Sequence, residues 1–194
     1  MASRIDESLI TLVRHGESDW NQRGLVQGQN DSPRLTARGR VQAQTVADAL
    51  RGLSFDYLVT SDLERARETA AFISAAIGLV PTADPLLRER CFGVFEGRPI
   101  GDLTPELTGL EHHIIMNPDA SPPSGESFND VVARAQLVIK RLRDERPGQR
   151  GLIVCHGGTV RALRASVNDK PIEGSSWYTV GNCSVWPLGA YDGK

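Results

Sequence analysis

The stretch LITLVRHGESDWN, residues 9–21, joins a short apolar run to an arginine, a histidine and a glycine. Residues 9–13 have the length and composition of a buried β-strand. A second stretch, GLIVCHGG at residues 151–158, repeats this pattern, because four apolar residues run into a histidine and two glycines. The carboxyl ends of neighbouring strands in an open α/β sheet form its ligand-binding crevice, and glycine lets backbone N–H groups approach an anion closely. The sequence therefore predicts that His15 and His156 share one site.

Apolar runs alternate with helical patterns along the chain, which is typical of an α/β fold. Besides residues 9–13 and 151–155, strands are expected within residues 55–61, 79–87 and 183–188. Helices are expected at residues 36–51, 62–77, 128–145 and 159–167. Residues 98–124 are less regular and end in a proline-rich loop, which makes them a candidate lid-like segment.

Two of the expected helices begin with N-terminal signals. Thr36 is a candidate N-cap of the first helix, and Ser127 with Asp130 three residues later resembles a capping box. The spacing of the apolar residues in the first helix indicates which side chains face the core, namely Val41, Val46 and Leu50.

Length and composition indicate one soluble domain over residues 1–194, with a short leader at residues 1–8. The chain is 40% hydrophobic and 24% charged, and its net charge of -2 argues against nucleic acid or an anionic membrane as the main partner. Any anion site must therefore be local. The first apolar run is too short for a signal peptide or a membrane span, so the cytoplasm is the expected location. The oligomeric state stays open, with a homodimer as one alternative.

Three cysteines, at positions 91, 155 and 183, are widely spaced and form no C-x-x-C pair. This spacing fits neither a metal knuckle nor a redox motif. All three are expected to be buried thiols.

A third strand end occurs in LVTSDLERARETAA, residues 58–71. Ser61 falls at the strand terminus, and Arg65 and Arg67 fall in the first turn of the next helix. The helix macrodipole disfavours cations in this turn by about 0.3–1 kcal/mol each. For Arg67, ion pairs with neighbouring acidic residues on a solvated face explain this position better than phosphate binding does. Arg65 is instead a candidate phosphate ligand, because a guanidinium beside a helix N-terminus can donate to phosphate oxygens.

The predicted crevice gathers four side chains that can carry positive charge: Arg14, His15, Arg65 and His156. Such a set favours a dianionic ligand. The arginines would repel a divalent cation, and the metal-binding spacing H-x-x-x-H is missing. Neither a metal nor another cofactor is therefore expected.

Five ordered motifs carry a resemblance to a known family: RHGESDWN (14–21), SDLERARETA (61–70), LLRERCFGVFEG (86–97), PSGES (123–127) and VCHGGTVRAL (154–163). Their order and intervals resemble the histidine phosphatase superfamily, in its phosphoglycerate mutase-like branch, from Leu9 to about Val185. The resemblance implies a three-layer α/β sandwich, with helices on both faces of a mostly parallel central sheet. It also implies metal-independent phosphoryl transfer through a covalent phosphohistidine.

The resemblance assigns the chemistry to particular residues. His15 is the implied nucleophile, and Glu89 is the implied proton donor to the leaving group. The phosphate pocket would be formed by Arg14, Arg65 and His156. Further contacts to phosphate or substrate are suggested at Asn21, Gln27, Gly28 and Gly157.

From the residues alone, Glu89 is one of two glutamates near a turn, the other being Glu96. We expect its neighbours Arg88 and Arg90 to point outward.

Residues 96–126 favour a phosphatase over a mutase. Arg98 is their only Lys or Arg, against acidic residues at positions 96, 102, 106, 111, 119 and 126. A mutase has to hold a bisphosphorylated, carboxylated intermediate, which further cations favour. The family's cofactor-dependent mutases have a longer insertion here, with lysine and paired arginines. The expected substrate is therefore a small phosphorylated metabolite that is hydrolysed.

His112 and His113 are ambiguous. Adjacent residues on a helix face different ways, so a surface feature is favoured and a role of one of them in a substrate lid stays open. Two other functions also stay open: a cofactor-dependent phosphoglycerate mutase, and a non-catalytic phosphate-binding module. The presence of both His15 and Glu89 favours an enzyme.

Overall fold

A five-stranded sheet forms the centre of the molecule, with strand order β3-β2-β4-β1-β5. The computed structural model describes residues 9–100, 118–167 and 179–189. The strands are β1 (Ile10–Arg14), β2 (Tyr57–Thr60), β3 (Pro81–Ala83), β4 (Gly151–Cys155) and β5 (Val185–Pro187). β1, β2, β3 and β4 are parallel to one another, and β5 is antiparallel to its neighbour β1. The parallel strands therefore end at one common edge of the sheet.

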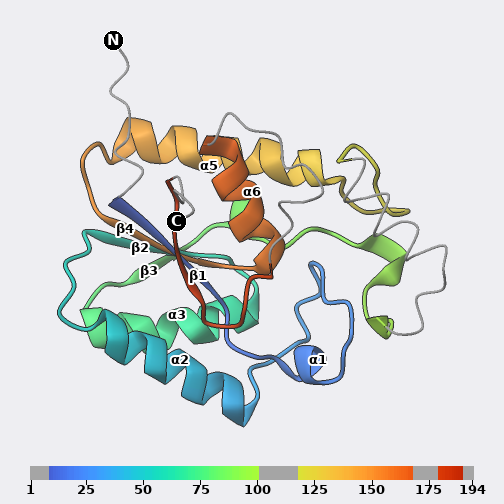
Figure 1. Cartoon of the computed structure of the whole chain (residues 1–194), viewed down its shortest axis with the longest axis horizontal. Helices are drawn as coiled ribbons and strands as arrows, with labels where there is room; N and C mark the ends of the chain where they lie inside the picture. The colour runs from blue at the N-terminus through green and yellow to red at the C-terminus, as the bar shows by residue number, and fades with distance from the viewer. Residues whose placement is uncertain (1–8, 101–117, 168–178, 190–194) are drawn as a thin grey trace.

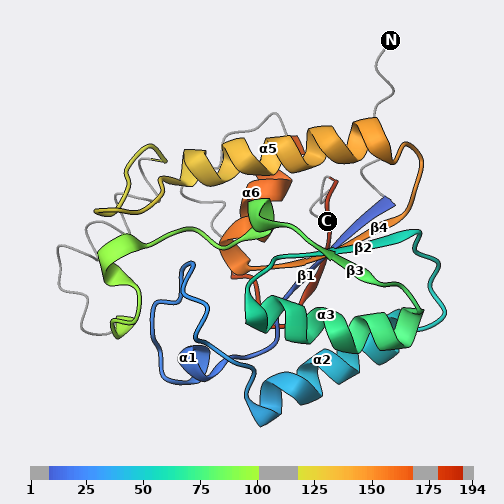
Figure 2. The same ribbon diagram turned by 180° about the vertical axis from the view of Figure 1, so that it is seen from behind.

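Helices cover both faces of this sheet (Figures 1 and 2). α2 (Ala37–Leu50) and α3 (Glu64–Ile77) lie on one face, and α5 (Phe128–Glu145) and α6 (Gly157–Val167) lie on the other. Shorter elements occur in the connections, namely α1 (Asp19–Gln22) and the 3-10 helices η2 (Pro85–Leu87) and η3 (Gly93–Phe95). The predicted three-layer α/β sandwich is confirmed.

The core has two halves because successive strand residues point to opposite faces. Leu12, Val59 and Ile153 belong to the cluster that packs against α5 and α6. Val13, Leu58 and Val154 belong to the cluster under α2 and α3. Because the central strands are buried on both faces, they read in the sequence as continuous apolar runs.

Helix caps lie where the sequence indicated. Thr36 accepts a hydrogen bond from the Gly39 amide at the start of α2, and Ser127 and Asp130 form the predicted capping box of α5. The last predicted helix begins earlier than expected, at Gly157 directly after His156. The prediction for Val41 is wrong, because 67% of this residue is exposed. The inward face of α2 is formed by Ala43, Val46, Ala47 and Leu50 instead.

The prediction for the cysteines holds only for Cys155, which is buried, since Cys91 and Cys183 are half-buried. All three are free thiols. Residues 1–8 and residues 101–117 of the lid-like segment lie outside the described residues.

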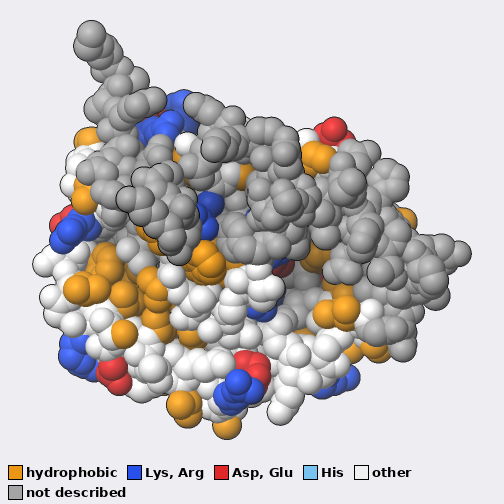
Figure 3. All heavy atoms as spheres, in the orientation of Figure 1, with side chains coloured by type: hydrophobic (Ala, Val, Ile, Leu, Met, Phe, Trp, Pro, Cys, Tyr) orange, Lys and Arg blue, Asp and Glu red, His pale blue; other side chains and the backbone are white. Residues whose placement is uncertain are grey.

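Charges of both signs are scattered over the face shown in Figure 3 rather than gathered into a field of one sign. Within the described ranges, no helix has the length and apolar character needed to cross a membrane.

Candidate active site

The shared edge of the parallel strands brings together the five residues predicted to do the chemistry. Arg14 ends β1 and His15 follows it, while His156 follows β4, the neighbour of β1. Arg65 lies in the first turn of α3, after β2. Glu89 follows η2, in the connection after β3. Four strand ends thus supply one site, as expected for a parallel sheet.

His15 is buried, and its ring orientation is fixed by the backbone. Nδ1 lies 2.7 Å from the carbonyl oxygen of Gly16. A carbonyl can only accept a hydrogen bond, so Nδ1 carries the proton and Nε2 keeps its lone pair. Burial, reinforced by the charges of Arg65 and Arg14, holds the pKa of His15 well below its ordinary value of 6.5. His15 is therefore a neutral imidazole with a nucleophilic Nε2 at neutral pH.

Gly16 has a structural role that differs from the predicted one. Its amide donates to Thr69 Oγ1 at 3.0 Å, and so it is not available to an anion. A Cβ added at Gly16 would lie 2.5 Å from the carbonyl oxygen of Gly39, and one at Gly39 would lie 2.0 Å from that of Glu17. The two glycines therefore let α2 approach the loop that carries His15.

His156 is fully buried, and its ring centroid lies 5.1 Å from that of His15. Nε2 lies 2.9 Å from Ser61 Oγ, which is the side chain at the end of β2. Burial, followed by the charges of nearby arginines (Arg65 first, then Arg14 and Arg134), lowers the pKa of His156 well below 6.5. Ser61 was singled out in the sequence only for its place at a strand end, and its contact with His156 was not foreseen.

The two arginines are held by backbone carbonyls. Arg65 is completely buried, and its terminal nitrogens donate to the carbonyl oxygens of Asn30 at 3.0 Å and Gly28 at 2.8 Å. Arg14 donates to the carbonyl oxygen of Val180. Burial lowers the pKa of Arg65 to about 10 and also lowers that of Arg14, so both remain cationic at neutral pH.

Three buried nitrogens of the site, Arg14 Nε, Arg65 Nε and His156 Nδ1, have no hydrogen-bond partner within the described part of the chain. An unpaired buried donor typically costs about 1–3 kcal/mol, so such groups are rare unless a ligand uses them. Two of these nitrogens belong to cations. The three together are suited to an anion with several acceptor oxygens.

Arg67 differs from Arg65 as predicted. Its side chain is 60% exposed and lies 3.9 Å from Glu64 Oε2, three residues earlier on α3. The pair is thus on the solvated face of the helix.

Glu89 lies close enough to the arginines to offset part of the effect by which burial lowers the pKa of Arg14 and Arg65. Its carboxylate oxygens accept hydrogen bonds from the amides of Arg90 at 2.8 Å and Gly158 at 3.0 Å. A Cβ at Gly158 would lie 2.2 Å from Glu89 Oε1, so this glycine is what allows the carboxylate to approach α6.

The expectation for the arginines that flank Glu89 holds for one of them. Arg88 points away and pairs with Asp62 at 2.6 Å. Arg90 is buried, contrary to prediction, and donates to the carbonyl oxygens of Ala120 at 2.9 Å and Glu126 at 2.7 Å. Two backbone carbonyls of the loop before α5 therefore compensate the burial of a cation that the sequence assigned to the surface.

The four suggested substrate contacts lie around the site in different ways. Asn21 and Gln27 both accept hydrogen bonds from Ser18 Oγ, at 3.2 and 2.9 Å. Gly28 holds Arg65 through its carbonyl oxygen. A Cβ at Gly157 would lie 3.7 Å from Arg14 Nε, which places this glycine beside the arginine.

Asn182 is a neighbour of the site that sequence reasoning missed. Its Nδ2 donates to the carbonyl oxygen of His15 at 3.1 Å and to Asn21 Oδ1 at 3.3 Å. It thereby ties the loop before β5 to the loop that carries the implied nucleophile.

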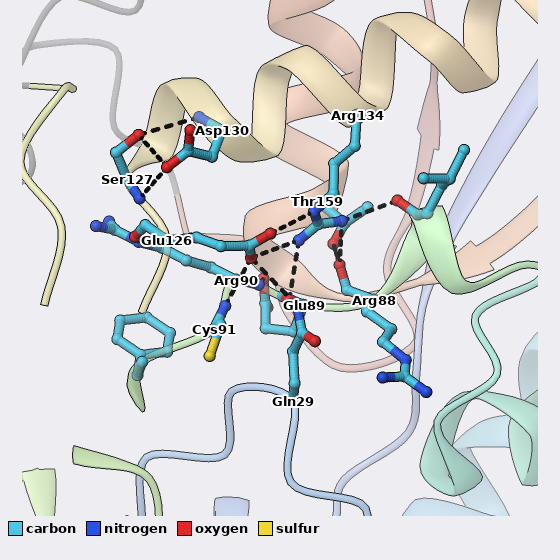
Figure 4. A network of polar contacts seen from close by, with 12 residues as sticks. Gln29, Arg88, Glu89, Arg90, Cys91, Glu126, Ser127, Asp130, Arg134 and Thr159 are labelled. Atoms are coloured by element: carbon cyan, nitrogen blue, oxygen red, sulfur yellow. Dashed lines mark hydrogen bonds and ion pairs between the residues drawn. The ribbon is translucent and has the colours of Figure 1, made fainter. Parts of the chain in front are cut away.

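A second omission is a polar network behind Glu89 (Figure 4). Arg134 of α5 and Glu126 form an ion pair at 2.8 Å, and Gln29 donates to Glu126 at 3.2 Å. The sequence does contain a signal for this network, namely Arg134 itself. It lies three residues after Val131 and four before Val138, both of which are buried in α5.

Two of the acidic residues counted in residues 96–126 are held by hydrogen bonds or an ion pair within the protein. Glu96 accepts from the amides of Gln29 at 2.9 Å and Phe92 at 3.0 Å, and Glu126 pairs with Arg134. The acidic residues at positions 102, 106 and 111 lie outside the described residues, as do His112 and His113. The charge argument against a mutase is therefore weaker than the sequence suggested.

In residues 9–100, 118–167 and 179–189, no group of three or more His, Cys, Asp or Glu side chains is arranged to hold a metal ion.

The family profile described as the histidine phosphatase superfamily (branch 1) matches residues 10–194. The probable phosphoglycerate mutase GpmB of Klebsiella pneumoniae is 37% identical over 177 residues, which cover 91% of this chain and 82% of that protein. A mycobacterial glucosyl-3-phosphoglycerate phosphatase, solved in complex with VO3, has a TM-score of 0.84 and 30% identity, with 91% of this chain and 90% of that chain covered.

A second solved structure, a putative alpha-ribazole-5'-P phosphatase from Escherichia coli, has a TM-score of 0.73 and 33% identity and covers 84% of this chain and 80% of its own. The family profile spans nearly the whole chain, and the matched structures share its fold. This chain therefore belongs to the histidine phosphatase superfamily, branch 1.

Proposed function

We propose that this chain is a cytoplasmic, metal-independent phosphatase that hydrolyses small phosphomonoesters through a covalent phosphohistidine on His15. The observation that carries the proposal is the set of buried nitrogens without partners on Arg14, Arg65 and His156, next to a neutral His15 whose Nε2 is free. A phosphate group supplies the acceptor oxygens that these donors need.

In the first half-reaction, Nε2 of His15 attacks phosphorus in line with the ester oxygen, so that an N–P bond forms as the P–O bond breaks. Arg14 and Arg65 stabilise the negative charge on the phosphoryl oxygens. A bound dianion offsets the charges that keep His156 neutral, so His156 takes up a proton and donates to phosphate through Nδ1. Glu89, protonated, gives its proton to the leaving alkoxide.

In the second half-reaction, the Glu89 carboxylate accepts a proton from water, whose oxygen attacks phosphorus. The N–P bond then breaks and its electron pair returns to Nε2 of His15. Inorganic phosphate leaves, and Glu89 is again protonated for the next cycle. The chain's own side chains thus supply the nucleophile, the charge stabilisation and the proton transfers.

The names of the relatives include both activities, since the GpmB proteins are named mutases and the matched structures include phosphatases. An experiment therefore has to distinguish hydrolysis from mutase activity. Hydrolysis is favoured because Arg98 is the only Lys or Arg in residues 96–126. A mutase depends on cations outside the phosphate pocket to retain the intermediate that carries its second phosphate.

The test is phosphate release from p-nitrophenyl phosphate in the presence of a chelator, together with trapping of an acid-labile, base-stable phosphoryl label. Wild-type protein is expected to show both, and His15→Asn neither. Absence of turnover between about pH 5 and 8 would indicate a phosphate-binding module without catalytic activity. With 3-phosphoglycerate and a trace of 2,3-bisphosphoglycerate, formation of 2-phosphoglycerate faster than hydrolysis of the best monoester would establish a mutase instead.

A further inference from the structure

The loop that carries Glu89 is fastened to α5 by one side chain, Arg134 (Figure 4). Arg134 donates to the carbonyl oxygens of Leu86 and Arg88 at 2.8 Å each and to that of Glu89 at 3.0 Å. Its remaining bonds go to both carboxylate oxygens of Glu126, at 2.8 and 3.0 Å. Three carbonyls of a short loop thus converge on one guanidinium.

The fit is complete, because a guanidinium has five N–H groups and Arg134 makes five hydrogen bonds. Its side chain is 12% exposed, so these bonds replace nearly all of its hydration. Lysine has three donors on a flexible stem and cannot reproduce this planar pattern.

Glu126 serves as the counter-ion and is itself saturated. Besides Arg134, it accepts from the Cys91 amide at 2.8 Å and from Gln29 Nε2 at 3.2 Å. Burial alone would raise the pKa of Glu126, but the hydrogen bonds from Arg134 and the Cys91 amide outweigh it and the pKa is lowered. Glu126 is therefore ionised at neutral pH, and the pair with Arg134 persists.

The same loop is held from two other directions. Gln29 Nε2 donates to the carbonyl oxygen of Glu89 at 3.1 Å, and Thr159 Oγ1 donates to that of Arg88 at 2.8 Å. Thr159 lies in α6, one residue after Gly158, whose amide holds the Glu89 carboxylate. The backbone around Glu89 is thus fixed relative to α6, the helix that begins directly after His156.

We propose that Arg134 is a positioning residue, paired with Glu126, that places the carboxyl group of Glu89 for protonation of the leaving group. The inference rests on the proposed function. Arg134 makes its five hydrogen bonds to the loop and to Glu126, and none to the residues of the phosphate pocket. Its charge is also among those that lower the pKa of His156. Arg134→Lys keeps that charge, so its effect reports on the position of Glu89.

The proposal predicts a dependence on the leaving group. The p-nitrophenolate ion is a weak base and departs without a proton, whereas the phenolate ion is more basic and gains more from a proton donor. A misplaced Glu89 therefore slows hydrolysis of phenyl phosphate more than that of p-nitrophenyl phosphate. A loosened fold or a damaged phosphate pocket would slow both substrates by the same factor.

The experiment measures kcat/KM for p-nitrophenyl, p-chlorophenyl and phenyl phosphate with wild type, Arg134→Lys, Arg134→Met and Glu89→Gln. The Arg134 variants and Glu89→Gln are all expected to lose about 10- to 100-fold more on phenyl than on p-nitrophenyl phosphate. In the Glu89→Gln background, Arg134→Lys is expected to change the phenyl phosphate rate by less than about twofold, because its effect passes through Glu89.

Lys140→Met is the matched control, because Lys140 lies six residues later on α5 and pairs with Asp144 of the same helix rather than with the Glu89 loop. Its dependence on the leaving group should equal that of wild type. If Arg134→Met does not fold, as judged by thermal unfolding, Arg134→Lys carries the test. An equal loss on all three substrates, or a full further loss in the Glu89→Gln background, would overturn the proposal. A wild-type protein that hydrolyses none of the three would refute the proposed function itself.

Discussion

Arg65 and Arg67 lie two positions apart on α3, and replacing each by alanine separates a residue of the phosphate pocket from a surface residue. Arg65 is 0% exposed and donates to the carbonyl oxygens of Gly28 and Asn30. Arg67 pairs with Glu64 on the exposed face of the helix. The two substitutions remove the same side chain from the same helix, so each is a control for the other.

The expected loss of activity depends on how many N–H donors each guanidinium has available for phosphate. Two of the N–H groups of Arg65 are occupied by the carbonyls of Gly28 and Asn30, and the others, including Nε, remain for a phosphate. Removing a donor aimed at the transition state costs about 2.7–4 kcal/mol, or about 10²–10³ in rate. Arg67→Ala removes one exposed ion pair, which contributes less than about 1 kcal/mol to stability. Arg65→Lys should resemble Arg65→Ala, since a lysine ammonium lacks the planar fork that points at both carbonyls and at the phosphate together.

The assay compares kcat/KM for p-nitrophenyl phosphate and the inhibition constant of inorganic phosphate, with thermal unfolding to verify that each variant is folded. Arg65→Ala should lose both activity and affinity for phosphate, and Arg67→Ala should stay within about twofold of wild type. Equal losses in the two variants, or an Arg65→Ala enzyme that still binds phosphate as wild type does, would refute the assignment of Arg65 to the pocket.

His15→Asn should abolish both turnover and phosphoryl labelling, because no other site residue has its nucleophile position, and labelling that survives would contradict the assignment. The buried neutral histidines His15 and His156 take up protons more readily in the unfolded state. The free energy of unfolding should therefore fall as the pH drops below about 6.5, by up to about 1.4 kcal/mol per pH unit for each histidine. Urea titrations at several pH values check this, and a profile as steep in the doubly substituted His15→Asn, His156→Asn protein would contradict it. Gly39→Ala should lower both stability and activity, since its Cβ would lie 2.0 Å from the Glu17 carbonyl oxygen, whereas Gly181→Ala, with 4.0 Å to the nearest atom, should change neither.

The features that the sequence predicted well are those in which a side chain marks a strand end. His15 and His156 follow apolar runs, and a parallel sheet brings such ends to one edge, so their proximity could be predicted from the strand pattern. The difference between Arg65 and Arg67 could be predicted too. The helix macrodipole disfavours a cation in the first turn, so an arginine there needs another partner, which is an acidic neighbour for Arg67 and a ligand for Arg65.

The features that it missed depend on contacts between segments distant in the chain. Val41 fits an apolar stripe of α2, but the helix turns Ala43 and Ala47 to the core, where small side chains allow close packing. Arg90 has the composition of a surface residue, yet the loop around Ala120 supplies carbonyl acceptors that compensate its burial. Such acceptors belong to the folded backbone and have no signature in the residue types.

Arg134 shows why the position of a proton donor is harder to predict than its identity. Three of its five acceptors are backbone carbonyls, which every residue possesses, so the loop before Cys91 could change its side chains and still bind the guanidinium. Only the donor and its counter-ion Glu126 depend on residue type. Glu126 lies in the PSGES motif, and Arg134 lies eight residues later, outside the five motifs. A cation beside the buried stripe of α5 indicates that a buried anion or carbonyl cluster exists. Which loop it fastens follows only from the fold, because the fold alone brings η2 and the loop after it against Arg134 of α5.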